Sequence, residues 1–531
     1  MTTIVSPQTS DRARHLAALA GLGQVDLAII GGGASGLGVA LDAALRGLSV
    51  ALLESHDFAK GTSSRATKLV HGGVRYLAQG NIALVREALH ERSTLLHNAP
   101  HLARPLPFVM PGYKCWETPF YGIGLKMYDA LAGKAGLGST EFLNAGETRQ
   151  CLPGIKAQGL KGGVKYWDGQ FDDARLAVTL ARTAASQGAL LLNYCPVTEL
   201  IHEQGRVAGL RCQDSETDAS YTVMAKCVVN ATGVWVDEIR QMDGAATGRS
   251  TQAMVAPSQG VHLVVDREFL PGDHAMLVPK TQDGRVLFAV PWLGKVILGT
   301  TDTPRRDLAR EPDAFAEDVE FILGEAAKYL SRAPRRSDVK SIWVGLRPLV
   351  RPPQNEGGST KKISREHTVL VSPSGLVTVT GGKWTTYRAM AEDVLDKCVE
   401  SALLPRLPLS ETSDFLLLGA AADGSGRASL ASAPGLDAYG TEAQWVEALP
   451  GADMELAPGL SVAMLRFAAR YEYARTVEDV LARRSRLLFL DARLAAELAP
   501  AAAAIMREET GVDPQLDAFL RLAEHYLRLP A

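Results

Sequence analysis

A glycine-rich turn near the start of the chain has the residue types and spacing that bind the phosphates of a dinucleotide. The turn reads Gly31-x-Gly33-x-x-Gly36, and Glu54 follows its last glycine by 18 residues. Gly31 permits a tight turn, Gly33 lets a pyrophosphate approach the backbone, and Gly36 lets a helix pack closely on a strand. The carboxylate of Glu54 can accept hydrogen bonds from ribose hydroxyls. These residues predict a nucleotide cofactor.

The segments around this turn predict the strand, helix and second strand that must position it. Residues 25–30 form an apolar run that ends at the glycines, and residues 48–53 form another that ends at Glu54. Between them, apolar residues recur at helical spacing from Ala34. The first turn, at Ala34 and Ser35, offers N–H groups and a positive dipole end to phosphate. This context predicts a dinucleotide site, but it does not separate FAD from NAD.

Length, charge and cysteine usage limit the class of protein. The 531 residues are too many for one hydrophobic core and predict two or three domains. A net charge of −3 argues against nucleic acid as the main partner, because such partners usually need a basic face. Six scattered cysteines predict a reducing cytosol, with neither a disulfide framework nor a metal site. The longest uncharged apolar stretch near the N-terminus has 15 residues, fewer than the ~20 that span a membrane.

A polar loop at residues 60–76 combines hydroxyls and cations that could bind an anion. It includes Gly61-Thr-Ser-Ser64 and Lys68-Leu-Val-His-Gly-Gly-Val-Arg-Tyr76, and this run closely resembles the FAD-dependent glycerol-3-phosphate dehydrogenases, the aerobic, quinone-linked family. Further segments that resemble this family follow in the same order, at residues 172–176, 229–236, 260–265, 290–293, 298–302, 345–349, 363–368 and 381–388.

The resemblance implies an α/β fold (α+β overall) with three parts. An FAD-binding Rossmann-like domain of the glutathione-reductase and D-amino-acid-oxidase type takes residues 24–80, 160–245 and 340–400. An inserted antiparallel-sheet substrate domain takes residues 81–159 and 246–339, and strand-like runs at 261–265, 286–290 and 296–298 support it. Residues 401–425 are expected to be a loose linker, and residues 426–531 a C-terminal helical domain.

The resemblance also implies that FAD contacts come from separate segments. The expected cofactor residues are Gly31, Gly33, Ala34, Ser35, Gly36, Glu54, Thr62, Ser63, Ser64, Lys68, Gly72, Val197, Thr232, Gly233, Gly382 and Thr385. Val197 resembles the family's adenine-contacting valine, although a plain core valine explains it nearly as well. We interpret Asp172 and Asp173, which precede a helical run, as N-capping carboxylates and not as catalysts.

Glycerol 3-phosphate is the substrate that the resemblance implies, and its phosphate needs fixed cations. The candidates are Arg347, Arg365 and Arg75, together with Tyr76 and Lys383. Arg347 and Arg365 are favoured over Arg75 as phosphate contacts. Taken singly, each of these side chains is more often a solvated surface residue.

The implied reaction oxidises a secondary alcohol. A base takes the C2 hydroxyl proton while the C2 hydride moves to N5 of FAD, which gives dihydroxyacetone phosphate. A histidine is most easily tuned for this task, so His71 is the first choice and His262 the alternative; Lys383 is expected near flavin or substrate. A structural role, in which His71 only holds its loop in place, explains this residue as well as a catalytic role does.

The remaining partners follow from the family and stay open at this stage. Family members pass electrons to quinone from a peripheral position on the inner, cytoplasmic face of the cell membrane. The oligomeric state of this chain, with a homodimer as one option, is left open. Residues 113–134 mix aromatics with Lys114, Lys126 and Lys134, which fits an interfacial segment, although core aromatics with solvated lysines are the commoner arrangement. The competing functions are a glycerol-3-phosphate oxidase that uses oxygen, a flavin-binding protein without turnover, and an NAD-dependent dehydrogenase.

Overall fold

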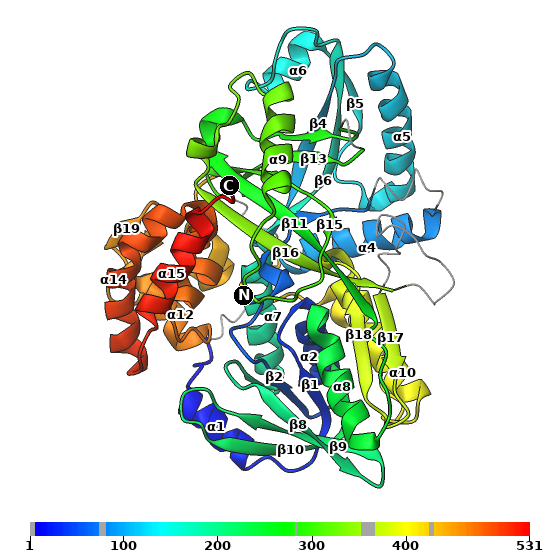
Figure 1. Cartoon of the computed structure of the whole chain (residues 1–531), viewed down its shortest axis with the longest axis vertical. Helices are drawn as coiled ribbons and strands as arrows, with labels where there is room; N and C mark the ends of the chain where they lie inside the picture. The colour runs from blue at the N-terminus through cyan, green and yellow to red at the C-terminus, as the bar shows by residue number, and fades with distance from the viewer. Residues whose placement is uncertain (1–5, 74–80, 282–283, 352–366, 424–429) are drawn as a thin grey trace.

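Two large sheets and a C-terminal group of helices form the protein. The computed structural model describes residues 6–73, 81–281, 284–351, 367–423 and 430–531. Within these ranges, one sheet has 8 strands and the other 10. In Figure 1 the smaller sheet lies in the lower half and the larger one in the upper half, with the orange and red C-terminal helices against one side of both.

The 8-stranded sheet is the dinucleotide-binding sheet, with the order β17-β18-β10-β1-β2-β7 and β8 and β9 extending from β10. The five adjacent strands from β18 through β10, β1 and β2 to β7 run parallel to one another. The strands are β1 (Val25–Ile30), β2 (Val50–Leu53), β7 (Leu190–Leu192), β8 (Val197–Glu203), β9 (Arg206–Gln213), β10 (Ser220–Asn230), β17 (His367–Val371) and β18 (Val377–Gly381).

The register of this sheet brings three strand ends together. Ile30 pairs with Leu53 of β2 on one side and with Asn230 of β10 on the other. The carboxyl ends of β1, β2 and β10 therefore meet at one edge, which is where doubly wound sheets bind their ligands. The predicted strand at residues 25–30 is confirmed residue for residue.

Helices cover both faces of this sheet. One hydrophobic core combines β1 and β2 with α2, α7 and α10, and another combines them with α1 and residues of α8. Asp172 caps α7 by accepting the N–H of Arg175 at 3.2 Å, so its predicted capping role is confirmed. The helices are α1 (Arg12–Ala20), α2 (Ala34–Leu45), α7 (Asp173–Ser186), α8 (Val236–Thr247) and α10 (Tyr387–Glu400).

The 10-stranded sheet is antiparallel except between β12 and β4. It includes β6 and β16, which the predicted boundaries at residues 160 and 340 assign to the FAD-binding parts. An apolar strand pattern does not show which sheet a strand joins, so those boundaries needed correction. The strands are β3 (Leu69–Val70), β4 (Ala103–Gly112), β5 (Glu141–Asn144), β6 (Gly162–Phe171), β11 (Val255–Asp266), β12 (Ala275–Val278), β13 (Leu287–Trp292), β14 (Lys295–Gly299), β15 (Thr303–Pro304) and β16 (Ser341–Val350).

Four helices accompany the larger sheet: α4 (Ile82–Asn98), α5 (Glu117–Ala132), α6 (Ala145–Cys151) and α9 (Ala316–Tyr329). Helix α9 packs on β11, β13 and β14, and α5 packs on β4 and β6. Among the helices that the structure describes, none combines the length and the apolar character needed to cross a bilayer.

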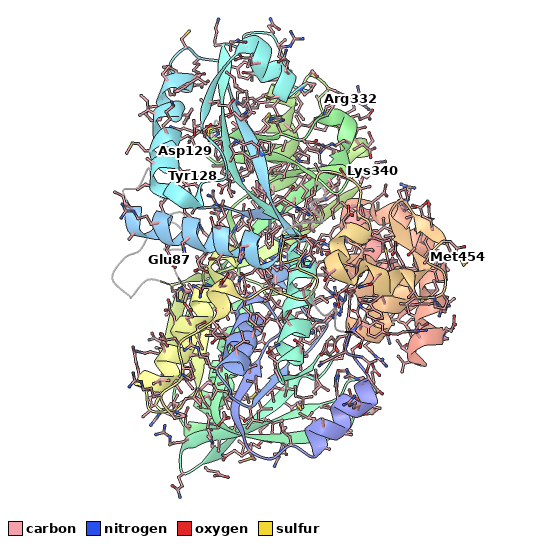
Figure 2. All side chains as sticks on the ribbon, turned by 180° about the vertical axis from the view of Figure 1, so that it is seen from behind. Glu87, Tyr128, Asp129, Arg332, Lys340 and Met454 are labelled. Carbon is pink, nitrogen blue, oxygen red and sulfur yellow. The ribbon has the colours of Figure 1, made fainter. Side chains whose placement is uncertain are left out.

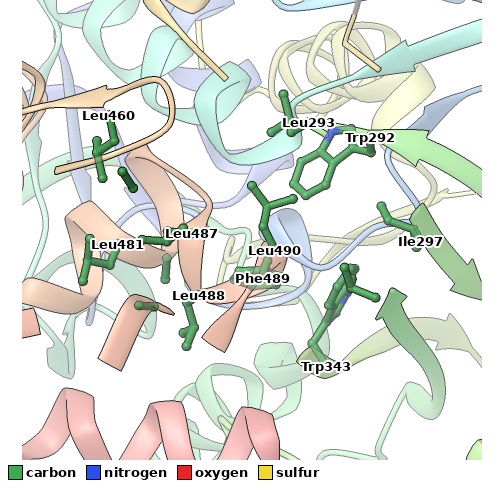
Figure 3. Close-up of a cluster of buried hydrophobic side chains, with 14 of the residues drawn as sticks. Trp292, Leu293, Ile297, Trp343, Leu460, Leu481, Leu487, Leu488, Phe489 and Leu490 are labelled. Atoms are coloured by element: carbon green, nitrogen blue, oxygen red, sulfur yellow. The ribbon is translucent and has the colours of Figure 1, made fainter. Parts of the chain in front are cut away.

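The C-terminal part is helical, as predicted, with one short two-stranded sheet. Residues Leu487, Leu488, Phe489 and Leu490 of α13 pack beside Trp292 and Trp343 of the larger sheet (Figure 3). The C-terminal part therefore shares a hydrophobic core with the larger sheet, which we call the substrate sheet below. Its elements are α11 (Ala443–Glu447), β19 (Glu455–Ala457), β20 (Leu460–Ser461), α12 (Val462–Tyr471), a π-helical turn (Asp479–Arg484), α13 (Leu487–Leu490), α14 (Ala492–Thr510) and α15 (Leu516–Leu527).

The predicted loose linker at residues 401–425 is anchored to the rest of the protein at several of the residues that the structure describes. Leu404 and Leu417 are buried in the core of the dinucleotide-binding part. Asn98 donates from Nδ2 to the carbonyl of Thr412 at 2.8 Å and accepts the N–H of Leu417 at 2.9 Å. The prolines and glycines of this linker prevent regular helices and strands, but they do not prevent its packing against the core.

Candidate active site

The glycine turn after β1 has the geometry that the sequence predicts. Gly31 has φ +109°, a conformation that L side chains rarely adopt. A Cβ atom at Gly31 would lie 2.6 Å from the carbonyl oxygen of Ala231, and one at Gly36 would collide with the carbonyl of Gly31. Gly33 is the N-cap of α2 and supplies no capping side chain; of the first N–H groups of that helix, the N–H of Ala34 donates to Ser63 Oγ. Close backbone packing therefore leaves the helix N-terminus open to a phosphate group.

Glu54 lies at the end of β2 beside this turn. Its Oε2 accepts the N–H of Gly32 at 2.6 Å, and its Oε1 accepts the N–H of His56 at 2.9 Å. The Ser55 hydroxyl also donates to Oε1 at 3.1 Å. These bonds hold the carboxylate at the edge of the sheet, and Oε2 keeps a lone pair for a ribose hydroxyl.

The hydroxyl-rich loop after β2 folds back onto the helix start. Ser63 Oγ accepts the N–H of Ala34 at 2.9 Å, and Thr62 Oγ1 donates to the carbonyl of Leu346 at 2.5 Å. The loop thus connects the dinucleotide turn with β16 of the substrate sheet. Ser64 is buried and its Oγ donates to the carbonyl of Gly61 at 3.4 Å.

The opposite wall comes from the ends of β10 and β18. Thr232 Oγ1 donates to Asn230 Oδ1 at 2.7 Å, while Asn230 Nδ2 donates to the carbonyl of Val236 at 2.9 Å. Gly381 and Gly382 have φ values of +82° and +73°. They turn the chain at the end of β18 before Lys383 and Thr385, and a Cβ atom at Gly382 would collide with Sδ of Met390.

A single cavity of about 1510 Å³ joins these segments. It exceeds the ~300–1,000 Å³ of ordinary small-molecule pockets, which suits a dinucleotide together with a substrate. The predicted site residues that line it are Gly31, Gly33, Ala34, Ser35, Glu54, Thr62, Ser63, His71, Val197, Thr232, Gly233, His262, Arg347, Gly382, Lys383 and Thr385. Arg75, Tyr76 and Arg365 lie outside the described residues.

Four predicted cofactor residues do not line the cavity: Gly36, Ser64, Lys68 and Gly72. Gly36 acts through close packing, which is the role its position in the motif assigns. Lys68 is a correction, since its side chain is fully buried and its Nζ contacts Asp173 and the carbonyl of Ser64, each at 2.7 Å. The sequence of a loop rich in hydroxyls and cations does not indicate which of its cationic side chains is buried.

The two candidate histidines lie on the same cavity in different surroundings. His71 follows β3 and is partly exposed. His262 is 2% exposed, stacks on Trp343 with ring centroids 5.2 Å apart, and its Nε2 lies 2.9 Å from Thr67 Oγ1. Burial lowers the pKa of His262 well below its ordinary value, and the charges of Lys68 and Arg347 lower it further. His262 is therefore neutral near pH 7.

Arg347 brings a cation into the cavity from β16. Its Nη1 donates to the carbonyl of Gln259 at 3.0 Å and lies 3.5 Å from Asp302 Oδ1, and its Nη2 donates to Thr300 Oγ1 at 3.3 Å. A Cβ atom at Gly260 would collide with Nη2, so the missing side chain at this position makes room for the guanidinium. These contacts fix the planar fork at the cavity wall.

The cavity also contains residues that the sequence analysis missed. Arg310 lies over the ring of Trp235 at 3.7 Å, and Trp235 Nε1 donates to the carbonyl of Leu308 at 3.0 Å. Both Arg310 and Trp235 line the cavity. Asp168 of β6 is a buried carboxylate on the wall. Trp235 lies within the matched segment 229–236, but nothing in the sequence indicates that Arg310 would fold over it.

These observations fit FAD. The glycine cradle and open helix N-terminus can take the pyrophosphate, Glu54 the ribose, and the Gly382–Thr385 turn the isoalloxazine ring. A dinucleotide-binding sheet whose cavity continues beneath a large antiparallel sheet defines the class of FAD-dependent oxidoreductases. Residues 26–389 match the family model described as FAD dependent oxidoreductase, and residues 410–516 match the C-terminal domain of alpha-glycerophosphate oxidase.

Relatives narrow this class. The mitochondrial glycerol-3-phosphate dehydrogenase of Bos taurus is 40% identical over 96% of this chain and 74% of its own length. That of Saccharomyces cerevisiae is 38% identical over 96% and 89%. The glycerol-3-phosphate dehydrogenase from Bacillus halodurans, solved in complex with FAD, has a TM-score of 0.77 at 31% identity over 97% of this chain and 98% of that one. The chain belongs to the FAD-dependent glycerol-3-phosphate dehydrogenase family.

A more distant structure shares the fold alone. The L-alpha-glycerophosphate oxidase from Mycoplasma pneumoniae has a TM-score of 0.56 at 16% identity, over 75% of this chain and 99% of that one. The family membership confirms the predicted recognition, fold class, enzyme class and FAD cofactor.

Proposed function

We propose that this enzyme oxidises sn-glycerol 3-phosphate to dihydroxyacetone phosphate and passes the electrons to a quinone. The observation that carries the proposal is the position of Arg347, which comes from the substrate sheet yet lines the same cavity as the Gly382–Thr385 turn. The guanidinium is held by the carbonyl of Gln259, the hydroxyl of Thr300 and the carboxylate of Asp302, and its planar fork is suited to a phosphate dianion. Relatives at 40% identity are named glycerol-3-phosphate dehydrogenase, which supports the same substrate.

Each residue has a separate task in the proposed reaction. Arg347 holds the phosphate, and Lys383, which lines the same cavity, adds a second cation. His71 accepts the proton of the C2 hydroxyl, since the buried His262 is a weaker base. Bound FAD supplies the two-electron oxidant that takes the C2 hydride. His262, held by Thr67, remains available as a neutral hydrogen-bond partner for the substrate.

The quinone half of the proposal is supported by an apolar face on α5. Trp116, Phe120, Ile123 and Met127 are 55%, 66%, 63% and 55% exposed, and their spacing places them along one side of the helix. Phe120, Ile123 and Met127 also line the cavity, so the face continues into its mouth. Exposed apolar surface of this kind marks an interaction site. Trp116 and Phe120 are thus exposed aromatics, whereas Tyr128 of the same segment is 1% exposed, as the commoner arrangement of core aromatics expects.

We therefore infer that α5 rests on the lipid surface from which quinone is drawn, on the inner face of the cell membrane. Lys114 Nζ lies 5.8 Å from the centroid of Trp116 and Lys126 Nζ lies 5.5 Å from that of Phe142, so cations border the apolar face. An amphipathic element with this composition binds anionic lipid at the interface.

Two experiments test the two halves. Protein reduced anaerobically with glycerol 3-phosphate should be reoxidised by a soluble quinone much faster than by oxygen; faster reoxidation by oxygen would make the oxidase reading correct.

In vesicle flotation with anionic lipid, the double variant Phe120→Ser, Ile123→Ser should lose binding. Met454→Ser, at a 59% exposed methionine of the C-terminal part (Figure 2), should float like the wild type. Unchanged flotation of the α5 variant, or of Lys114→Glu, Lys126→Glu and Lys134→Glu combined, would reject the lipid surface.

A further inference from the structure

A buried hydrogen-bond cluster holds the backbone next to His71. The N–H of Gly72 donates to Tyr128 Oη at 2.9 Å and lies 3.3 Å from Asp168 Oδ1. Tyr128 is 1% exposed and Asp168 is 2% exposed, so water does not compete for these bonds. A hydrogen bond in such surroundings fixes geometry more firmly than one at the surface.

Three separate elements supply this cluster. Val70 pairs with Gly169, which brings Asp168 of β6 alongside the residues that follow β3. Tyr128 comes from α5 and donates to Asp168 at 3.2 Å, while Arg92 of α4 donates from Nη1 to Asp168 Oδ1 at 2.9 Å. Figure 2 shows Tyr128 on α5 where this helix lies next to α4. The carboxylate therefore has a fixed cation, a fixed phenol and a fixed backbone donor.

The direction of each bond is determined. Asp168 is held as an acceptor by Arg92, and Tyr128 uses its only hydroxyl proton on Asp168. The phenol oxygen must then accept, and the N–H of Gly72 is the donor that it receives. A Cβ atom at Gly72 would collide with Tyr128 Oη and lie 2.6 Å from Leu89 Cδ2. The absence of a side chain at Gly72 is what allows the backbone to approach the phenol this closely.

We propose that Tyr128 and Asp168 are positioning residues that set where His71 presents its imidazole to the cavity, an inference that rests on the proposed function with His71 as the base. The peptide between His71 and Gly72 is the unit they hold, so displacement of Gly72 rotates the backbone that carries the imidazole. A misplaced base slows proton abstraction while leaving the phosphate contact of Arg347 in place.

The conservative variant Tyr128→Phe removes one hydroxyl and keeps the buried ring. In single-turnover mixing under anaerobic conditions, glycerol 3-phosphate should reduce its bound flavin about tenfold more slowly than in the wild type, with KM and FAD content little changed. Amide hydrogen exchange in a peptide covering residues 69–73 should become faster. Tyr113→Phe is the matched control, because Tyr113 Oη donates to the carbonyl of Lys156 at 2.8 Å away from this cluster, and it should behave like the wild type.

A double-mutant cycle separates positioning from general stability. In a His71→Asn background, the further change Tyr128→Phe should add almost nothing, because the side chain that it positions is gone. A second tenfold loss in that background, or a wild-type rate for either Tyr128→Phe or His71→Asn, would overturn the proposal. If the wild-type flavin is not reduced by glycerol 3-phosphate at all, the proposed function fails instead, so the two failures are distinguishable.

Discussion

The Nζ atom of Lys68 lies 2.7 Å from Oδ2 of Asp173, and neither side chain has any exposed surface. Asp173 Oδ1 also accepts from Arg486 of the C-terminal part at 3.1 Å, and Asp173 Oδ2 accepts the N–H of Ala66 at 3.1 Å. Lys68 and Arg486 both donate to the carbonyl of Ser64 at 2.7 Å. One buried carboxylate thus connects the flavin-side loop, α7 and the C-terminal helices.

The first prediction concerns the loss of this carboxylate. Asp173→Asn removes the carboxylate that both Lys68 and Arg486 contact, although Asp172 stays 3.6 Å from Arg486, so the free energy of unfolding should fall by about 3–5 kcal/mol. Lys68→Met removes a cation and fills its space with an apolar side chain, so it should cost much less. Urea unfolding measures both. The surface pair of Asp26 with Lys226, 2.7 Å apart, provides the control, because Asp26→Asn should cost about 1 kcal/mol or less. Equal losses for Asp173→Asn and Asp26→Asn would contradict the account.

The second prediction is a pH dependence of stability from Lys68. Burial lowers the pKa of Lys68 from 10.5 to about 7, although the charge of Asp173 raises it. Between these values the unfolded chain binds a proton at Lys68 that the folded protein does not, so stability rises with pH across this window. The gain is at most about 1.4 kcal/mol per pH unit. Unfolding of wild type and Lys68→Met at pH 7, 8 and 9 should show a difference that grows in favour of the wild type; a constant difference would show that Lys68 keeps its proton.

The third prediction concerns substrate binding by Arg347. Arg347→Ala should lower kcat/KM for glycerol 3-phosphate by roughly 10- to 150-fold, which corresponds to a charge-assisted hydrogen bond of ~1.5–3 kcal/mol. FAD content should stay at the wild-type level, since the guanidinium contacts residues of the substrate sheet. Arg332→Ala, at a 55% exposed arginine paired with Glu268 (Figure 2), is the matched control. A variant at Arg347 with wild-type kcat/KM would show that the phosphate lies elsewhere.

The fourth prediction concerns cofactor retention. Gly36→Ala places a methyl group against the carbonyl of Gly31, so the turn cannot keep its shape and the protein should purify with little FAD. Gly23→Ala has no atom within 4 Å of the added methyl group and should retain the flavin. The ratio of visible flavin absorbance to protein absorbance measures both. Full flavin in Gly36→Ala would mean that the turn does not hold the dinucleotide.

The sequence predicts the elements that depend on local pattern and loses accuracy where partners are distant. The strand at residues 25–30, the helix from Ala34 and the cap at Asp172 follow from periodicity and side-chain chemistry within a few residues, and the structure confirms them. The inward turn of Lys68 depends on Asp173, 105 positions away, and on Arg486 beyond it. No local pattern carries that information.

The same limit explains which parts of the site the sequence did not predict. Arg347 was found because its segment resembles the family, but the sequence gives no sign that Gly260 and Thr300 surround its guanidinium. Asp168 and Tyr128 were missed because a lone carboxylate in a strand and a lone tyrosine in a helix carry no motif. Sheet register and helix packing bring them to Gly72.

The measurement that tests the central claim most directly is a single anaerobic turnover of the FAD-loaded protein. Addition of glycerol 3-phosphate should bleach the visible flavin band and yield one dihydroxyacetone phosphate per flavin. The same substrate carrying deuterium at C2 should bleach the band several-fold more slowly, because the C2 hydrogen leaves as hydride. A flavin band that stays unchanged with saturating glycerol 3-phosphate would contradict the assignment of both the substrate and the cavity.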